Sequence, residues 1–382
     1  MSNKYEIYAI TAFGLEAVVA RELKNLGITD YTVENGRVVF NGGLEEVYKA
    51  NLWLRTAGRV HIKIAEFKAV TFEELYDKTR EINWGSILPE DAFFHITGKS
   101  VKSTLFSISD CQAMVKKAIV DKMKEKYDTD WFEEDGPRYK MQISMLKDIA
   151  TITLDTSGEP LHKRGYRDLS GTAPLKETMA AALIQLSFWK KDRVLIDPFC
   201  GTGTIPIEAA MIARNIAPGL KRRFDFEDWT NFDRKLFNRL KQEAQDSINR
   251  DGELHILGSD LDDDAVRSAR RHAARAGVKE DIHFQRLDEA DISSSQKYGH
   301  LICNPPYGER AESDEGIFRL YRLMGDTFKK LDTWSYYIFA PDGLFEEPFG
   351  RKSDKKRKLF NGRILCNYYQ YFGPKPPRAR KD

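Results

Sequence analysis

Beyond residue 157 the sequence repeats one pattern, a short run of apolar residues followed by a segment with helical spacing. Two of the apolar runs are Val194-Leu195-Ile196 and His300-Leu301-Ile302-Cys303, and helical spacing covers Ile205 to Ala213 and Ala265 to Ala276. Short buried strands that alternate with helices are typical of a parallel sheet with helices on both faces. The sequence therefore predicts an α/β fold built on a doubly wound sheet.

The end of this half departs from the alternation. Lys358-Leu359-Phe360 and Arg363 to Tyr371 are strand-like runs, and Asn361-Gly362 between them is a strong signal for a hairpin turn. We therefore expect the parallel sheet to end in an antiparallel hairpin. This also places Lys355 to Lys358 beside or on an edge strand, where lysine protects against pairing with another chain.

The first 156 residues follow a different order. Between Tyr5 and Phe67 the strand and helix signals run βαββαβ, the order of a ferredoxin-like unit. A second small α+β unit follows, with a helix that begins in the capping-box pattern Ser109-x-x-Gln112 and two strands that meet at Lys147-Asp148. The segment Ser157-Gly158-Glu159-Pro160 is typical of a domain border. We therefore expect three parts, residues 1–67, 68–156 and 157–382.

A glycine-rich turn follows the first strand of the C-terminal part. The segment Asp197-Pro198-Phe199-Cys200-Gly201-Thr202-Gly203-Thr204 opens a helix at the edge of a doubly wound sheet where ligands bind. A dinucleotide-binding motif would need a third glycine where Pro206 stands, so a nicotinamide or flavin site is disfavoured. A P-loop is disfavoured as well, because Gly98-Lys99-Ser100 would need a glycine in place of Phe93.

Acidic residues follow the next two strands at the same edge. Asp260, which precedes Leu261, could accept hydrogen bonds from both hydroxyls of a ribose, and Asp288 could reach an adenine amino group. An aspartate at a strand end is more often a helix cap or a turn residue. Together with Asp197, however, these carboxylates stand at three successive strand ends, which favours one shared crevice.

The tetrad Asn304-Pro305-Pro306-Tyr307 directly follows an apolar strand. The exocyclic amine of a base is a poor nucleophile, because its lone pair is delocalised into the ring. If the Asn304 side-chain oxygen and the Pro305 carbonyl accept its two N–H groups, the nitrogen moves toward tetrahedral geometry and its lone pair is aimed. Proline fixes φ and removes a donor, and Tyr307 can stack on a flipped base. Alternatively, Pro-Pro ends the strand and Tyr307 packs against the domain.

The glycine-rich turn and the tetrad together resemble the cofactor loop and the amino-methylating tetrad of class I S-adenosylmethionine-dependent methyltransferases. Three longer stretches resemble a narrower group, the bacterial THUMP-domain guanine-N(2) methyltransferases of 23S ribosomal RNA. They are Asn304-Pro305-Pro306-Tyr307-Gly308-Glu309-Arg310, Leu161-His162-Lys163-Arg164-Gly165-Tyr166-Arg167 and Ala173-Pro174-Leu175-Lys176-Glu177. That group carries a ferredoxin-like segment and a THUMP domain before a Rossmann-like catalytic domain, in the order expected here.

The resemblance implies that S-adenosylmethionine is the cofactor and that a guanine N(2) amine in ribosomal RNA is the substrate. It implies that the tetrad is catalytic, with the roles given above for Asn304, Pro305, Pro306 and Tyr307. The residues that it implies for binding the cofactor are Asp197, Pro198, Phe199, Gly201, Gly203, Thr204, Asp260, Leu261, Asp288 and Asn304.

The resemblance further implies that the THUMP unit binds structured RNA. Phosphate contacts position such a substrate without reading its sequence. The candidates are basic residues of the THUMP unit and of the segment that follows it: Lys99, Lys102, Lys163, Arg164 and Arg167. Lys116 and Lys117 are explained equally well as part of a solvated helix face.

Charge is distributed unevenly along the chain. Residues 351–382 hold eleven Lys or Arg and two acidic residues, whereas the whole chain holds 60 basic and 58 acidic residues. A basic end of this kind can follow RNA phosphates, but it can equally be a solvated terminus.

Several classes of protein are disfavoured. Cys111, Cys200, Cys303 and Cys366 lie far apart without a C-x-x-C pair, which argues against a disulfide framework and against a metal site. Neither a signal peptide nor an apolar run of about 18 residues is evident. We expect a cytoplasmic enzyme with no membrane segment and no obligatory protein partner. Two other functions stay open, adenine-N(6) methylation of RNA or DNA and a non-catalytic role in ribosome assembly.

Overall fold

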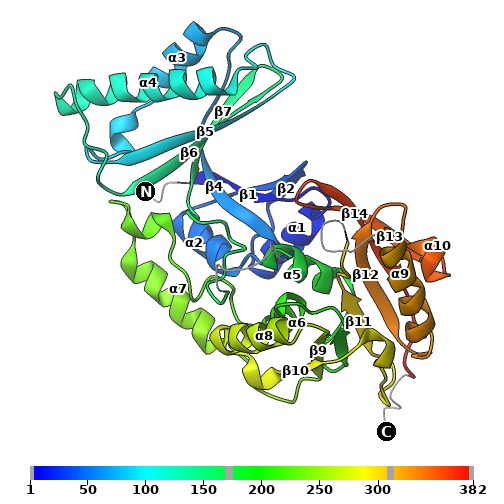
Figure 1. Cartoon of the computed structure of the whole chain (residues 1–382). Coiled ribbons are helices and arrows are strands. Elements are labelled where there is room, and N and C mark those ends of the chain that lie inside the picture. Colours follow the sequence, from blue (N-terminus) through cyan, green and yellow to red (C-terminus); the bar gives the residue numbers. More distant parts are fainter. Residues whose placement is uncertain (1–3, 168–174, 308–313, 378–382) are drawn as a thin grey trace.

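The computed structural model describes residues 4–167, 175–307 and 314–377, which form two sheets of seven strands each. Figure 1 shows the sheets in separate halves of the molecule, with α1 (Glu16–Asn25) and α5 (Glu177–Leu186) between them. Among the described helices, none is long and apolar enough to cross a membrane. None of the four cysteines forms a disulfide.

The N-terminal sheet contains both small α+β units. Its strands, in spatial order, are β2 (Tyr31–Glu34), β3 (Arg37–Gly42), β1 (Tyr5–Thr11), β4 (Ala57–Lys68), β7 (Ile149–Asp155), β6 (Arg138–Leu146) and β5 (Phe93–Val101). Its helices are α1, α2 (Leu44–Trp53), α3 (Phe72–Arg80) and α4 (Ile108–Tyr127). All neighbouring strands are antiparallel except β5 and β6, which α4 connects. The predicted ferredoxin-like order is confirmed in β1 to β4.

Strand β4 joins the two units. Its residues from Ala57 to Ile62 pair with β1, and those from His61 to Lys68 pair with β7, with an irregularity between Lys63 and Ala65. A strand of 12 residues is long enough to pair with a different partner along each half. The two small units are therefore parts of one continuous sheet.

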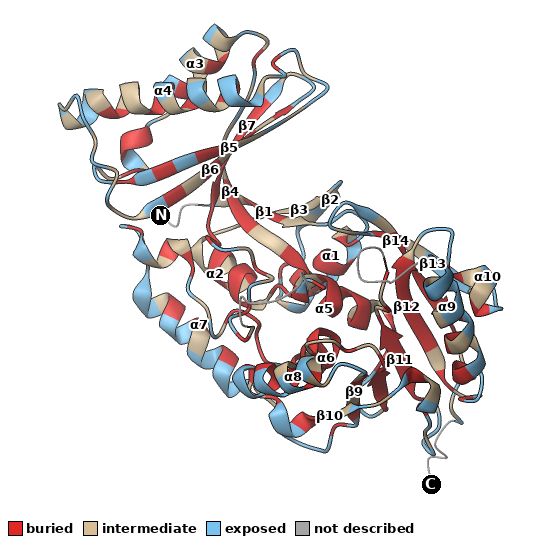
Figure 2. Ribbon diagram, viewed as in Figure 1, coloured by how far each residue is buried: buried red, intermediate tan, exposed pale blue. Residues whose placement is uncertain are grey.

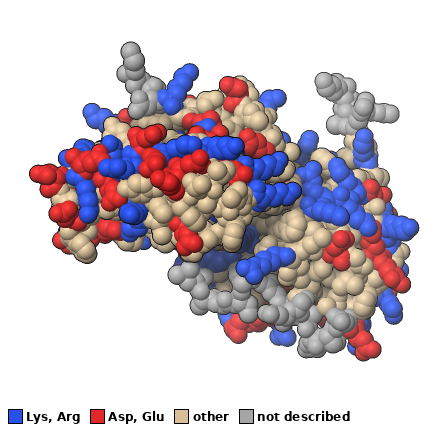
Figure 3. All heavy atoms as spheres, turned by 90° about the horizontal axis from the view of Figure 1, so that it is seen from above, with Lys and Arg blue, Asp and Glu red and all other residues tan. Residues whose placement is uncertain are grey.

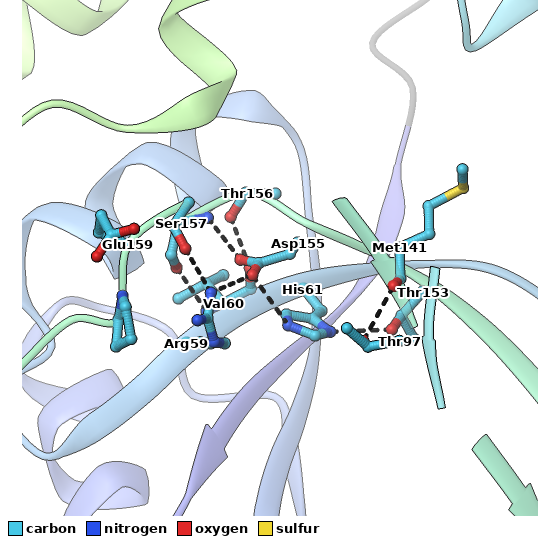
Figure 4. Close-up of polar contacts among 12 residues, drawn as sticks. Arg59, Val60, His61, Thr97, Met141, Thr153, Asp155, Thr156, Ser157 and Glu159 are labelled. Atoms are coloured by element: carbon cyan, nitrogen blue, oxygen red, sulfur yellow. Dashed lines mark hydrogen bonds and ion pairs between the residues drawn. The ribbon is translucent and has the colours of Figure 1, made fainter. Parts of the chain in front are cut away.

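A buried polar cluster lies where β4 meets the end of β7 (Figure 4). Arg59 forms an ion pair with Asp155, which also accepts a hydrogen bond from the Ser157 backbone N–H at 2.9 Å. The Nδ1 atom of His61 lies 2.9 Å from the Thr153 hydroxyl, and its Nε2 atom lies 3.8 Å from an Asp155 oxygen. Burial outweighs the nearby carboxylate and lowers the pKa of His61 to about 4. This imidazole is therefore neutral at neutral pH.

The neutral His61 makes stability sensitive to acid. Its pKa rises from about 4 in the folded protein to its ordinary value of 6.5 on unfolding, so the unfolded state gains a proton first as the pH falls. We expect about 2 kcal/mol of stability to be lost between pH 7 and pH 5 through this residue. Urea denaturation of His61→Gln should show a flatter pH dependence in this window. The exposed histidine control, His95→Gln, should follow the wild type, and equal slopes in all three proteins would contradict the assignment.

The second sheet has the predicted doubly wound order. Its strands, in spatial order, are β10 (Ile282–Arg286), β9 (Ile256–Asp260), β8 (Leu195–Asp197), β11 (His300–Cys303), β12 (Ser335–Pro341), β14 (Ile364–Tyr371) and β13 (Lys355–Asn361). The first five are parallel, and β14 and β13 form the antiparallel hairpin expected at the end. Its helices are α5, α6 (Thr204–Ala213), α8 (Asp263–Ala276), α9 (Asp314–Phe328) and α10 (Glu346–Phe349), whereas α7 (Arg234–Asp246) packs against α2 of the N-terminal half. Figure 2 shows these strands as mostly buried, whereas α7 and α8 carry exposed outer faces.

Each half of the molecule covers part of the other. Leu15 and Val18 beside and on α1 belong to the buried cluster of the C-terminal sheet. In return, the insertion between α6 and β9 packs on the N-terminal sheet, where the Trp229 ring stacks on Tyr139 with 5.1 Å between centroids. The Trp229 indole N–H also donates to the Arg138 carbonyl at 2.8 Å. The halves thus share apolar cores.

Two local predictions were wrong. Helix α4 begins at Ile108 after Ser107, so Ser109 lies inside the helix rather than at its cap. The Gln112 side chain instead donates to the Ile96 carbonyl of β5 at 2.8 Å, a long-range contact that competes with a capping box. In the β13–β14 hairpin, Asn361 pairs with Ile364, so the turn residues are Gly362 and Arg363. Gly362 has a φ of +63°, which suits the first central position of a type II′ turn.

Candidate active site

The predicted site residues follow the carboxyl ends of neighbouring parallel strands. From β8 the chain proceeds to β9 and β10 on one side, and it later returns to β11 on the other side. The order of strands therefore reverses between β8 and β11. Crevices at such a reversal are where open α/β sheets bind ligands. Asp197 ends β8, Asp260 ends β9, and Asn304 follows β11, so these three residues stand at that edge.

The glycine-rich turn needs both of its glycines for the backbone path. Gly201 and Gly203 have φ values of +51° and +88°, in the left-handed region that favours glycine. A Cβ atom at Gly203 would also lie 2.9 Å from the Cβ of Ala269 on α8. At Gly201, by contrast, a Cβ would meet no described atom within 4 Å. The turn is therefore packed against α8 on one side and open at Gly201.

The three aspartates form the same local turn. In each, Oδ1 accepts a hydrogen bond from the backbone N–H two residues later, at 3.1 Å for Asp197, 3.1 Å for Asp260 and 2.9 Å for Asp288. This is the turn role that aspartate commonly plays at a strand end. It leaves the second oxygen of each carboxylate available for another contact. For Asp260 that oxygen accepts the Gly201 N–H at 2.8 Å, which links β9 to the glycine-rich turn.

The three carboxylates differ in environment. Asp197 is buried, and burial, with a smaller contribution from Asp260, raises its pKa well above the ordinary range. Asp288 is exposed, and Asp260 is partly exposed. Leu261, next to Asp260, exposes 51% of its surface, which is unusual for leucine at a strand end. Pro198 is buried and Phe199 partly buried beneath the same edge. Asp260 thus combines a fixed carboxylate with partial exposure.

Asn304 presents an unpaired oxygen. Its Oδ1 atom is shielded from solvent and has no hydrogen-bond partner among the residues that the structure describes. A buried acceptor without a donor costs about 1–3 kcal/mol, so such an atom calls for an explanation. A ligand that brings an N–H group would remove the penalty. Pro305 beside it is also buried and has no backbone N–H to offer.

Tyr307 is packed into the protein. It is 9% exposed, and its hydroxyl accepts a hydrogen bond from Asn361 Nδ2 at 2.7 Å. The Cys366 sulfur lies 3.8 Å from the same hydroxyl. Residues of the β13–β14 hairpin therefore fix the position of the Tyr307 hydroxyl. Sequence reasoning missed Asn361, which it treated only as a turn residue.

Arg164 does not reach the surface, so its prediction as an RNA contact was wrong. Arg164 is 3% exposed, and its guanidinium donates to the carbonyls of Leu161 and Arg55. It also lies 3.5 Å from Glu208 of α6, which accepts a hydrogen bond from the Tyr166 hydroxyl at 3.2 Å. This network joins the N-terminal half to the helix that begins at the glycine-rich turn. Arg164 is buried because the Glu208 carboxylate is fully buried and needs a neighbouring cation.

Removing Arg164 should therefore destabilise the fold. Arg164→Ala leaves the Glu208 carboxylate buried without its cation, and we expect a loss of about 3–5 kcal/mol in the free energy of unfolding. Urea denaturation measures this loss directly. The neighbouring exposed side chain gives the control, since Lys163→Ala should change stability by less than about 0.5 kcal/mol. Unchanged stability combined with weaker RNA binding in Arg164→Ala would restore the RNA role.

The other basic candidates are scattered. Arg167 donates to the Thr204 hydroxyl at the start of α6 and pairs with Glu177 at 3.4 Å, so it supports the glycine-rich turn. Lys163 is exposed and paired with Glu159. On the THUMP-like unit, Lys99, Lys102 and Lys117 are exposed, and Lys116 pairs with Glu134 at 2.9 Å. The structure therefore does not bring these candidates into one cluster.

Two cysteines lie close to the site. Cys200 and Cys303 are buried, and burial raises the pKa of each thiol well above its ordinary value. A thiol in this state is a poor nucleophile. Both residues therefore act as small buried side chains.

Three family models match the chain in succession. The RlmL ferredoxin-like domain matches residues 6–61, the THUMP domain matches residues 69–155, and the RMKL-like methyltransferase domain matches residues 164–370.

Individual relatives agree with these matches. A Bacillus subtilis protein named "Putative RNA methyltransferase YpsC" is 49% identical over 99% of both chains. The ribosomal RNA large subunit methyltransferase K/L of Psychromonas ingrahamii is 39% identical over 97% of this chain, which spans 51% of that longer protein. The solved structure of SMU.472 complexed with SAH (S-adenosylhomocysteine) is 44% identical, with a TM-score of 0.92 over 99% of this chain and 100% of that one.

Proposed function

Because this chain belongs to the RMKL-like methyltransferase family, whose members use S-adenosylmethionine, we propose that it methylates the exocyclic N(2) amine of a guanine in 23S ribosomal RNA. The observation that carries this proposal is the unpaired Oδ1 atom of Asn304. It is a buried acceptor at the switch point of the sheet, and the N–H of a base amine would supply the donor that it lacks among the described residues.

In this proposal the tetrad binds and orients the nucleophilic base amine. The Asn304 Oδ1 atom and the Pro305 carbonyl accept the two N–H groups of the base amine, which localises its lone pair on nitrogen. The shielding of Asn304 strengthens these hydrogen bonds, because water does not compete for them. In this proposal Tyr307 borders the flipped base, and its hydroxyl is held by Asn361. A flipped base gains stacking contacts in such a pocket.

The glycine-rich turn and the aspartates suit the cofactor. S-adenosylmethionine supplies a methyl group on a positively charged sulfur, which is a good leaving group. Gly201 leaves room for close approach, and the Asp260 carboxylate has lone pairs for ribose hydroxyls beyond the one that accepts the Gly201 N–H. In this proposal Asp288, which follows the next strand of the sheet, accepts a hydrogen bond from the adenine amino group. The protein then contributes alignment of the two reacting groups.

The RNA substrate is supported by the domain order. A THUMP domain precedes the methyltransferase domain, and the relative from Psychromonas ingrahamii is named for large-subunit ribosomal RNA. The choice of guanine follows the family resemblance, because the tetrad would accept an adenine N(6) amine equally well.

Nucleoside analysis tests the proposal. The protein is incubated with isotope-labelled S-adenosylmethionine and with 23S ribosomal RNA from cells that lack it, and DNA and protein serve as control substrates. Label in N(2)-methylguanosine is the expected result. Label in N(6)-methyladenosine would keep the chemistry and change the substrate. Cofactor binding without transfer to naked RNA or to ribosomal particles would instead favour an assembly factor.

A further inference from the structure

The β13–β14 hairpin carries much of the excess positive charge of the chain. β13 is the outermost strand of its sheet, and Lys355, Lys356 and Lys358 on it are exposed. Arg363 in the turn is exposed as well. Seen from above in Figure 3, Lys and Arg side chains gather over the half of the molecule in which Figure 1 places this hairpin. They lie beside a hollow between the two halves.

Much of this charge is not neutralised by the protein. Lys356 pairs with Glu346 of α10, and Arg351 pairs with Asp354 at 3.3 Å. In contrast, Lys355, Lys358 and Arg363 form no ion pair with any described residue. Adjacent cations repel one another, so leaving them unpaired costs stability unless an anion is bound. This surface is therefore suited to a polyanion.

The hairpin also exposes apolar groups among these cations. Phe360 is 39% exposed between Lys358 and the turn, and Ile364 is 48% exposed across from Asn361. Exposed aromatic rings interleaved with basic side chains are typical of surfaces that bind nucleic acid, because bases stack on the rings while phosphates meet the cations. The edge strand thus combines both kinds of contact.

The hairpin lies directly beside the tetrad. Asn361, at the end of β13, donates to the Tyr307 hydroxyl at 2.7 Å, and Cys366 of β14 lies on the same side. Lys358 and Arg363 are within three residues of Asn361 along the hairpin. An RNA strand whose base enters beside Tyr307 would therefore pass near this end of the hairpin.

A loop of the N-terminal half contacts the hairpin. The Arg357 guanidinium donates to the Gly14 carbonyl at 3.1 Å, in the loop between β1 and α1. A Cβ on Gly14 would lie 2.9 Å from the Lys358 carbonyl, so the two segments are in close contact. The basic edge is thus held at a fixed place relative to the tetrad.

We propose that the exposed edge of the β13–β14 hairpin, with Lys355, Lys358 and Arg363, binds the phosphates of substrate RNA that flank the target nucleotide. This proposal rests on the proposed function only for the identity of the RNA. It assigns a role to the basic end of the sequence that is separate from the THUMP domain. The hairpin holds the strand close to the site, and the THUMP domain binds elsewhere.

A charge-reversal variant distinguishes RNA binding by the hairpin from protection of the edge strand against pairing with another chain. Glutamate keeps a charge on the edge strand, so it still blocks pairing with another chain, but it repels phosphate. For K355E/K358E/R363E we expect the Kd for naked 23S ribosomal RNA to rise by about tenfold or more. The slope of log Kd against log salt should fall by about two to three, the number of lost phosphate contacts. Affinity for S-adenosylmethionine should stay at the wild-type value, which verifies the fold.

A control variant has the same net charge as the hairpin variant. K235E/K279E/K297E reverses three exposed lysines on α7, before β10 and before β11, away from the hairpin. Its RNA affinity should remain close to the wild type. Equal RNA affinities for both triple variants and the wild type would overturn the proposal.

Failure of this inference and failure of the proposed function give different results. Weaker RNA binding by the hairpin variant would support the hairpin even if the wild type leaves no methyl group on guanine. Unchanged RNA binding by the hairpin variant, when the wild type methylates guanine, would overturn only the proposal for the hairpin.

Discussion

Replacing Asn304 with alanine is expected to lower kcat by at least about a hundredfold and to leave the affinity for S-adenosylmethionine within about twofold. The substitution removes the Oδ1 atom, which is shielded and has no hydrogen-bond partner among the described residues. The base amine then loses the acceptor that aims its lone pair. Single-turnover transfer to RNA measures the rate, and calorimetry measures cofactor binding.

A conservative variant separates chemistry from packing. Asn304→Asp keeps an acceptor oxygen at the same position, so we expect it to retain much more activity than Asn304→Ala. If both variants lose cofactor affinity as strongly as rate, Asn304 serves the cofactor pocket rather than the nucleophile.

Replacing Asp260 with alanine is expected to have the opposite effect, a loss of cofactor affinity of about 10–100-fold with kcat largely recovered at saturating cofactor. The carboxylate anchors the Gly201 N–H at 2.8 Å and, in our proposal, accepts the ribose hydroxyls. Both contacts favour binding of the cofactor rather than activation of the amine. Calorimetric titration and saturation kinetics check the two parts.

The matched control lies nearby. Asp264 on α8 is an exposed carboxylate that pairs with Arg267 and does not contact the glycine-rich turn. Asp264→Ala should bind the cofactor normally. A fall in kcat for Asp260→Ala that excess cofactor does not rescue would contradict the division of roles between Asp260 and Asn304.

The sequence predicts this fold well wherever a pattern is local. Alternation of strand and helix gave the doubly wound sheet, and the runs around Phe360 and Tyr369 gave the antiparallel hairpin. Local signals fail where a distant partner competes. Ser109 and Gln112 have the form of a cap, but Gln112 is taken by the Ile96 carbonyl of the neighbouring strand.

The candidate site was predicted in part. Motifs adjacent to strand ends place Asp197, Asp260 and Asn304 at one edge, because strand ends of a parallel sheet share an edge. The burial of Arg164 and the contact between Asn361 and Tyr307 depend on residues 44 and 54 positions away along the chain. No spacing rule connects such pairs, and only the packing of whole elements brings them together.

Strand β4 has a consequence for how a target is chosen. Its two ends pair with different units within one strand, and the buried Arg164–Glu208 pair links the same half to α6. A shared strand and a buried ion pair at the junction favour a fixed span between the THUMP domain and the tetrad. In our proposal, a substrate RNA therefore has to present the feature bound by the THUMP domain and its target base at that separation. Selection would then read geometry in the RNA, with little need to read bases around the target.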